Sequence, residues 1–184
     1  MSRTHATLIG LIAIVLWSFI VSLLRIVSEN FGTVGGAALM YTLATFFLIA
    51  SVGVTNLRQF PKKYLIVGGL LFVTYELCLA FSIGYARNSR QAIEVGMVNY
   101  LWPTLTILAT IVFNRQHATW LVIPGFLLSM FGITWVLGDD EGLNVALMLE
   151  NLMLNPISYL LAFIGAIIWA AYCVITAKYA KGKN

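Results

Sequence analysis

An amide side chain and two aromatic rings lie close together inside an apolar run at positions 91–113. Asn99 and Tyr100 are followed by Trp102 and Pro103. Proline has no backbone N–H, and its ring pushes against the carbonyl four residues earlier, which here is the carbonyl of Asn99. Polar groups at such depth are costly, so they usually face a cavity or another helix. We expect a helix kinked at Pro103 that offers a free carbonyl, an amide and two rings to a small polar aromatic ligand.

Two acidic residues also fall inside apolar runs. Glu76 is expected near the middle of the membrane, where a lone carboxylate would be protonated or paired with a cation or a donor. It could bind a substrate amino group or carry a coupling proton. A neutral glutamic acid that joins two helices is the structural alternative. Glu94 lies one turn from the end of its run, near Arg87 and Arg90, and is a possible rim residue that could reach water.

Three of the five tryptophans occupy unusual positions. Trp17, Trp102 and Trp169 fall near the middle of apolar runs, given a rise of about 1.5 Å per residue, whereas tryptophan normally concentrates at the membrane interfaces. Together with Tyr75 and Glu76, they would form a layer at the depth where secondary transporters hold their substrates. The alternative is that these rings only pack between helices.

The composition of the chain indicates a membrane protein. Hydrophobic residues make up 60% of the 184 residues and charged residues 10%, with a mean hydropathy of +0.91. These residues cannot provide the polar shell of a soluble domain. We predict an all-α protein with six membrane-spanning helices, each close to the roughly 20 apolar residues that cross a bilayer. The predicted spans cover residues 6–25, 34–55, 64–86, 91–113, 120–137 and 158–177.

The basic residues are divided unequally between the two sides of these spans. One side holds eight: Arg3, Arg58, Lys62, Lys63, Arg115, Lys178, Lys181 and Lys183. The other side holds three: Arg25, Arg87 and Arg90. The positive-inside rule therefore predicts that both termini are cytoplasmic. Topology accounts for the net charge of +4, and no nucleic-acid partner is expected.

The sequence offers no case for an enzyme. The two histidines, His5 and His117, lie near predicted cytoplasmic ends, and Cys78 and Cys173 are far apart in the chain. We therefore expect no metal site and no disulfide. A glycine-rich phosphate loop is also missing, which argues against a nucleotide. We expect no cofactor.

The connection between the last two predicted spans is longer than the others. Asn144, Asn151 and Asn155 recur there at spacings of seven and four, which places them on one face of a helix. We predict a short helix within residues 143–154 that lies on the outer membrane surface. An irregular apolar loop tucked against the spans is the alternative.

The first and last spans resemble each other. Small and apolar residues precede Trp17 in residues 10–18 and Trp169 in residues 163–170. Five spans separate the starts of the two copies, so the copies must run in opposite directions across the membrane. This arrangement is typical of an inverted-repeat transporter. The chain would then hold one five-helix unit and the first helix of a second, truncated unit.

The same residues resemble those of a known family. Residues 3–17, 35–36, 75–76, 91–103 and 168–173 are similar to those of the YddG-type aromatic amino-acid exporters. These proteins belong to the EamA branch of the drug/metabolite transporter (DMT) superfamily. The resemblance implies a carrier of the bacterial inner membrane, with ten helices in two inverted halves, that exports phenylalanine, tyrosine and tryptophan. Some related proteins also export methyl viologen.

For this chain, the resemblance implies three parts. Residues 1–137 would form the first EamA-type five-helix repeat, residues 138–157 a periplasmic connection with a short interfacial helix, and residues 158–184 the first helix of a second, truncated repeat. Besides the lipid bilayer, a second copy of the chain or a missing C-terminal half is the expected partner. Either would complete the transport pathway.

The function that we expect is export of aromatic amino acids by alternating access around a cavity in the middle of the membrane. The expected substrate-binding residues are Trp17, Tyr75, Glu76, Asn99, Tyr100, Trp102 and Trp169. The rings would line the walls, and Glu76 and Asn99 would meet the polar groups of the substrate. One alternative is an exporter of lipophilic aromatic cations with Glu76 as their partner. The other is a non-transporting fragment or scaffold in which the rings are packing.

Overall fold

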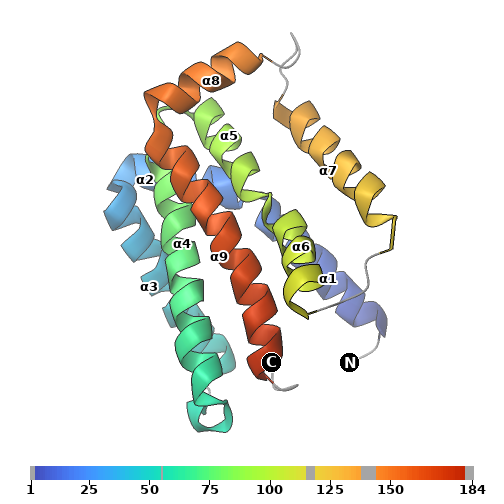
Figure 1. Ribbon diagram of the computed structural model, residues 1–184. Helices are drawn as coiled ribbons and strands as arrows, with labels where there is room; N and C mark the ends of the chain where they lie inside the picture. Colours follow the sequence, from blue (N-terminus) through green and yellow to red (C-terminus); the bar gives the residue numbers. More distant parts are fainter. Residues whose placement is uncertain (1–2, 55, 115–118, 138–143, 181–184) are drawn as a thin grey trace.

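The computed structural model describes residues 3–54, 56–114, 119–137 and 144–180, and these residues are almost entirely helical (Figure 1). No strand occurs within these ranges, which confirms the all-α prediction. The helices are α1 (Arg3–Ser18), α2 (Ile20–Phe31), α3 (Thr33–Val52), η1 (Leu57–Gln59), η2 (Tyr64–Gly68), α4 (Gly69–Gly84), α5 (Ser89–Asn99), α6 (Trp102–Asn114), α7 (Val122–Leu137), α8 (Val145–Leu154) and α9 (Pro156–Ala180).

The helices are those of a multi-pass membrane protein. In the described part of the chain, four segments are long and apolar enough to span a bilayer: Thr33–Val52, Tyr64–Gly84, Ser89–Phe113 and Pro156–Ala180. The pair α1 and α2 adds a fifth if the bent pair is one span. Helix α7 occupies the place of the remaining predicted span, and its segment Val122–Gly132 is apolar but shorter than the length that crosses a bilayer. The predicted number of six is therefore approximate.

The first predicted span, residues 6–25, differs from the structure in shape and length. The helix bends by 42° between Ser18 and Ile20 and continues to Phe31. At the bend, the Ser18 hydroxyl donates to the carbonyl of Val15 at 2.7 Å, a bond that competes with the backbone ladder of the helix. Beyond it, the helix continues past Arg25, whose guanidinium pairs with Glu29 at 2.8 Å within α2.

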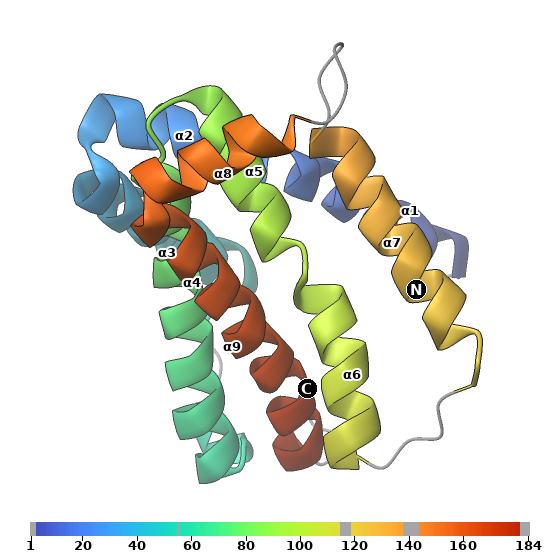
Figure 2. The same cartoon turned by 45° about the horizontal axis from the view of Figure 1, so that its top comes forward.

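Helix α9 lies between α4 and α6 and also contacts α5 (Figures 1 and 2). Its buried side toward these neighbours is built from small residues, among them Ala162, Gly165, Ala166 and Ala170. Small residues allow membrane helices to approach closely. Large apolar side chains of α1, α3 and α7 are mostly exposed, as expected of surfaces that face lipid. The core of the bundle therefore lies around α4, α5 and α9.

Helix α8 crosses one end of the bundle, over the beginnings of α5 and α9 (Figure 2). It occupies the segment for which the asparagine spacing predicts a short helix. The beginning of α1 and the end of α9 both lie toward the opposite end of the bundle (Figure 1).

Candidate functional site

Four aromatic rings gather around Trp169 of α9, and we call these five rings together the aromatic cluster. The ring centroid of Trp169 lies 4.4 Å from that of Tyr75 and 5.0 Å from that of Tyr172. The centroids of Trp102 and Phe72 lie at 6.0 and 6.1 Å. These separations are those of favourable aromatic pairs. The cluster joins α4, α6 and α9.

Helical spacing places these rings side by side. Phe72 precedes Tyr75 by three residues on α4, and Tyr172 follows Trp169 by three residues on α9, so each pair shares one helix face. Phe72 and Tyr172 were not among the predicted site residues. The three-residue spacing from a predicted ring is the signal in the sequence that could have identified them.

A glycine brings α9 close to this site. Gly165 lies one turn before Trp169, and a Cβ atom added to it would stand 3.3 Å from Cβ of Cys78 and 3.5 Å from Oδ1 of Asn99. A Cβ atom at position 165 would therefore press on Cys78 of α4 and would lie in ordinary contact with the amide of Asn99. The bare backbone of Gly165 lets three helices meet at the polar edge of the cluster.

Asn99 supplies that polar edge. It is 5% exposed, and its Nδ2 atom donates to the hydroxyl of Tyr75 at 3.3 Å. Within the described residues, neither Oδ1 of Asn99 nor Nε1 of Trp169 has a hydrogen-bond partner, although both atoms are buried. Buried polar groups are normally paired, because an unpaired one loses its hydration without compensation. The cluster thus contains one unpaired acceptor and one unpaired donor.

The helix carrying Asn99 is interrupted directly before Pro103. Helix α5 ends at Asn99 and α6 begins at Trp102, with Tyr100 and Leu101 in a turn between them. The N–H of Leu101 donates to the carbonyl of Val98 at 3.2 Å, which tightens the backbone at the break. Pro103 cannot donate to the carbonyl of Asn99. Tyr100 lies at the turn but is not part of the aromatic cluster.

The structure does not bring Glu76 or Trp17 into the cluster. The carboxylate of Glu76 accepts a hydrogen bond from the Tyr41 hydroxyl of α3 at 2.8 Å. Neighbouring residues on a helix point about 100° apart, so Tyr75 can face α9 while Glu76 faces α3. Trp17 is 45% exposed on α1, and none of the ring pairs that the cluster forms among the described residues includes it.

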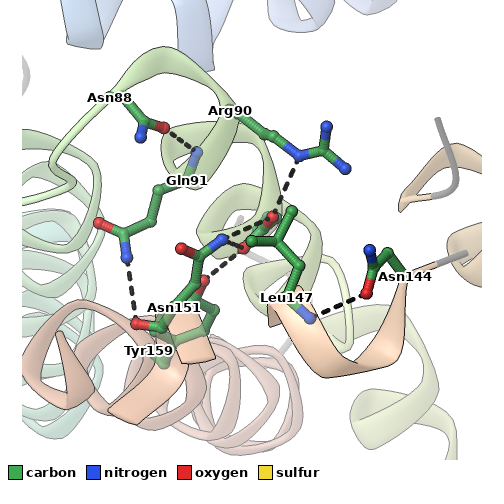
Figure 3. Close-up of polar contacts among 8 residues, drawn as sticks. Asn88, Arg90, Gln91, Asn144, Leu147, Asn151 and Tyr159 are labelled. Atoms are coloured by element: carbon green, nitrogen blue, oxygen red, sulfur yellow. Dashed lines mark hydrogen bonds and ion pairs between the residues drawn. The ribbon is translucent and has the colours of Figure 1, made fainter. Parts of the chain in front are cut away.

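Glu94 is buried rather than at a water-filled rim. It is 4% exposed, and its carboxylate accepts hydrogen bonds from Nδ2 of Asn151 at 3.1 and 3.2 Å and from the hydroxyl of Tyr159 at 2.5 Å (Figure 3). Nε of Arg90 lies 3.6 Å from the same carboxylate. Glu94 therefore connects α5 to both α8 and α9.

Gln91 extends the hydrogen-bonded group around Glu94 toward the turn between α4 and α5. Its Oε1 atom accepts from the backbone N–H of Arg87 at 2.7 Å and from Nδ2 of Asn155 at 3.0 Å, and its Nε2 atom donates to the carbonyl of Asn151 at 3.2 Å. Sequence reasoning placed Asn151 and Asn155 on one helix face but missed their partners. Gln91 and Glu94 lie three residues apart on α5 and so share one helix face. This spacing is the signal in the sequence that could have identified them as the partners of the asparagines.

A cavity with a volume of about 640 Å³ lies between α6 and α9. Leu105 and Ala170 belong to its almost wholly apolar lining, and Lys178 and Tyr179 lie at one end. None of the predicted site residues lines it. Within the aromatic cluster, Tyr75 is buried at 2% exposure, whereas Phe72 is 40% exposed.

Comparison with known proteins supports the resemblance seen in the motifs. The chain is 60% identical over 184 residues to the aromatic amino acid exporter YddG of Escherichia coli (strain K12) and 57% identical to that of Salmonella typhimurium (strain 14028s / SGSC 2262). These alignments cover 100% of the chain and 63% of each relative. The exporter YddG of Ancylobacter novellus is 30% identical over 190 residues, covering 98% of the chain and 61% of that protein.

No protein-family model and no solved structure matches the chain. The chain spans less than two thirds of the length of its curated relatives. It is nevertheless similar along essentially its whole length to proteins named aromatic amino acid exporters.

Proposed function

We propose that this chain carries the aromatic-substrate site of a secondary transporter that exports phenylalanine, tyrosine and tryptophan across the bacterial inner membrane. One observation carries the proposal: an unpaired buried acceptor, Asn99 Oδ1, and an unpaired buried donor, Trp169 Nε1, lie within one cluster of rings. The names of the relatives support the same substrate class.

The chemistry of the cluster suits an aromatic amino acid. The rings of Tyr75, Trp102 and Trp169 offer apolar faces and edges against which a substrate ring can stack. Oδ1 of Asn99 can accept from the substrate ammonium group, and Nε1 of Trp169 can donate to its carboxylate. Leaving a buried polar atom unpaired costs about 1–3 kcal/mol, which a bound substrate would recover.

In this proposal, transport requires a protein or an assembly larger than this chain. In the proposal, residues 1–137 are the first five-helix repeat, residues 138–157 a periplasmic connection and residues 158–184 the start of a second repeat. The remaining part of a longer carrier, or a second copy, would complete alternating access around the cluster. The beginning of α1 and the end of α9 would face the cytoplasm, and α8 would lie on the periplasmic surface, which agrees with the excess of basic residues that the sequence assigns to the side opposite α8.

The structure favours amino acids over lipophilic aromatic cations. A cation exporter would need a carboxylate that faces the rings, whereas Glu76 is bonded to Tyr41 on the side of α3. A pure packing role for the rings would leave Asn99 Oδ1 and Trp169 Nε1 without any use for their hydrogen-bonding capacity.

The first test is binding of radiolabelled phenylalanine to the purified chain in lipid nanodiscs. Trp169→Phe keeps a ring but removes the donor, and Asn99→Leu removes the acceptor at similar volume. Each change is expected to weaken binding by about tenfold, the effect of losing roughly one hydrogen bond to a charged group. Trp135→Phe, which changes a 74% exposed ring on α7, serves as the matched control. Equal affinity in all four proteins would contradict the proposed site.

The second test is uptake of radiolabelled phenylalanine into proteoliposomes. Uptake by the chain that Trp169→Phe abolishes would support a complete pathway, assembled from more than one copy. Binding without uptake would show that the site is present and that transport needs the remaining part of the carrier.

A further inference from the structure

We propose that Glu94 is a positioning residue for the aromatic cluster: through Tyr159 it sets the register between α5 and α9 at which Asn99 meets Tyr75 and Trp169. This inference deepens the proposed function, and it rests on that function only for the identity of the bound molecule. Its structural content, the link between the carboxylate and the ring geometry, can be tested without any ligand.

Two contacts join α5 and α9 at matched spacings. The helices lie side by side and both run away from the α8 end of the bundle (Figures 1 and 2). Near that end, Tyr159 of α9 donates to Glu94 of α5 at 2.5 Å. Further along, Oδ1 of Asn99 lies 3.5 Å from the position of a Cβ atom on Gly165.

The distances along the two helices agree. Asn99 follows Glu94 by five residues on α5, and Gly165 follows Tyr159 by six residues on α9. At about 1.5 Å of rise per residue, these separations are roughly 7.5 and 9 Å. A single register therefore satisfies both contacts, and a slip at one contact would be passed on to the other.

The surface between the two contacts cannot set this register by itself. Val95, Tyr159 and Ala162 form a small buried cluster there, with Val98 packed against it. Apolar contact is non-directional, and the small side chain of Ala162 gives little resistance to sliding. A hydrogen bond to a carboxylate has a defined length and direction. The bond between Glu94 and Tyr159 supplies what the apolar contact lacks.

The carboxylate of Glu94 is itself held in place from three helices. Asn151 of α8 donates to both of its oxygens, Tyr159 of α9 donates to one, and Arg90 of α5 pairs with it (Figure 3). Sliding of α9 relative to α5 would break the Tyr159 bond and weaken the pairing of a buried charge, which is costly. The arrangement therefore resists slippage more than any one bond would.

The experiment uses the near-ultraviolet circular dichroism of the full chain in nanodiscs, because that signal depends on how aromatic rings are held relative to one another. The contribution of the aromatic cluster is defined as the part of the signal that Trp169→Phe removes. Glu94→Gln is expected to lose most of this contribution. Glu150→Gln, an equal change of charge at an exposed position on α8, is the control and is expected to keep it.

A swap of charges separates positioning from a general loss of stability. Asn151→Asp alone would place two carboxylates against each other and is expected to lose the cluster signal. Asn151→Asp combined with Glu94→Gln restores an amide facing a carboxylate across α5 and α8, and is expected to recover the signal. If Glu94→Gln does not fold, Tyr159→Phe tests the same bond, since it removes one hydroxyl and leaves Glu94 with Asn151 and Arg90.

The affinity for phenylalanine provides the second readout. Glu94→Gln is expected to weaken binding by about tenfold, equivalent to about 1.4 kcal/mol, and the swap to restore it. An unchanged cluster signal in Glu94→Gln and Tyr159→Phe would overturn the inference. So would a lost signal that the swap fails to restore. If the parent chain does not bind phenylalanine but the signal follows the expected pattern, the proposed function fails while the positioning role stands.

Discussion

At the scale of single residues, the candidate site depends on what lies next to Asn99. The amide donates to Tyr75 on one side and faces the bare backbone of Gly165 on the other. A Cβ atom at position 165 would stand 3.5 Å from the buried Oδ1 of Asn99 and would fill the space in front of it. The size of residue 165 should therefore control both packing and ligand access.

Gly165→Val is expected to destabilise the protein by about 1–3 kcal/mol, because its methyl groups would press on Cys78 and Asn99. It should also abolish phenylalanine binding, since it would occupy the space in front of Oδ1 of Asn99. Thermal unfolding and binding in nanodiscs measure the two effects. Gly10→Val is the control, because a Cβ atom on Gly10 meets no atom within 4 Å. Equal behaviour of the two variants would show that the space at Gly165 is not restricted.

At the scale of the helices, α8 is attached to the bundle by polar side chains rather than by its apolar residues. Leu149, Leu152 and Met153 are exposed, whereas Asn151 and the neighbouring Asn155 reach α5 and the preceding turn. The side chain of Arg87 adds a bond to the carbonyl of Leu154 at 2.6 Å. Polar side chains therefore hold this short helix against the ends of α5 and α9. Its exposed apolar side can contact lipid.

Gln91→Leu should detach α8 while nearly preserving side-chain volume. It removes the acceptor of the Arg87 N–H and the donor to the Asn151 carbonyl, each of which costs about 1–3 kcal/mol when it is left buried and unpaired. It also removes one of the acceptors of Asn155. Hydrogen exchange of residues 145–154 is expected to become at least about tenfold faster. Gln59→Leu, at an exposed position in η1, is the control. Unchanged exchange would mean that apolar contacts hold α8.

At the scale of the whole molecule, the arrangement of helices predicts which surfaces face which side of the membrane. Helix α8 lies at the end of the bundle opposite to the beginning of α1 and the end of α9 (Figure 1). The lysines before η2 and at the end of α9 belong to the basic side. The positive-inside rule assigns that side to the cytoplasm.

Cysteine labelling in intact cells tests this orientation. In a background that carries Cys78→Ala and Cys173→Ala, Glu150→Cys on α8 is expected to react with a membrane-impermeant maleimide. Lys62→Cys, which is also exposed, is expected to react only after the membrane is permeabilised. The opposite pattern would invert the topology and place α8 on the cytoplasmic surface.

Several features of this molecule could be read from the sequence because they depend on local properties. Apolar content and length predict an all-α membrane protein, and the structure differs mainly at the first predicted span, which bends by 42° after Ser18 and continues to Phe31. Pro103 indicates the break between α5 and α6, because its missing N–H acts on its own helix. The motifs around residues 91–103 also indicate the relatives to which the chain is similar.

The partners of the polar side chains were decided only by the tertiary structure. Membrane helices that are apolar on nearly every face carry little information about which side turns inward. The depth in the membrane expected from the sequence therefore grouped Trp17 and Glu76 with Trp169. In the structure, the helix face that carries Glu76 points to Tyr41, and Trp17 is exposed. Burial of Glu94 likewise depends on α8 folding back over α5, a contact between residues 57 positions apart. The chemistry of each residue is local, but its partner is set by how the helices pack.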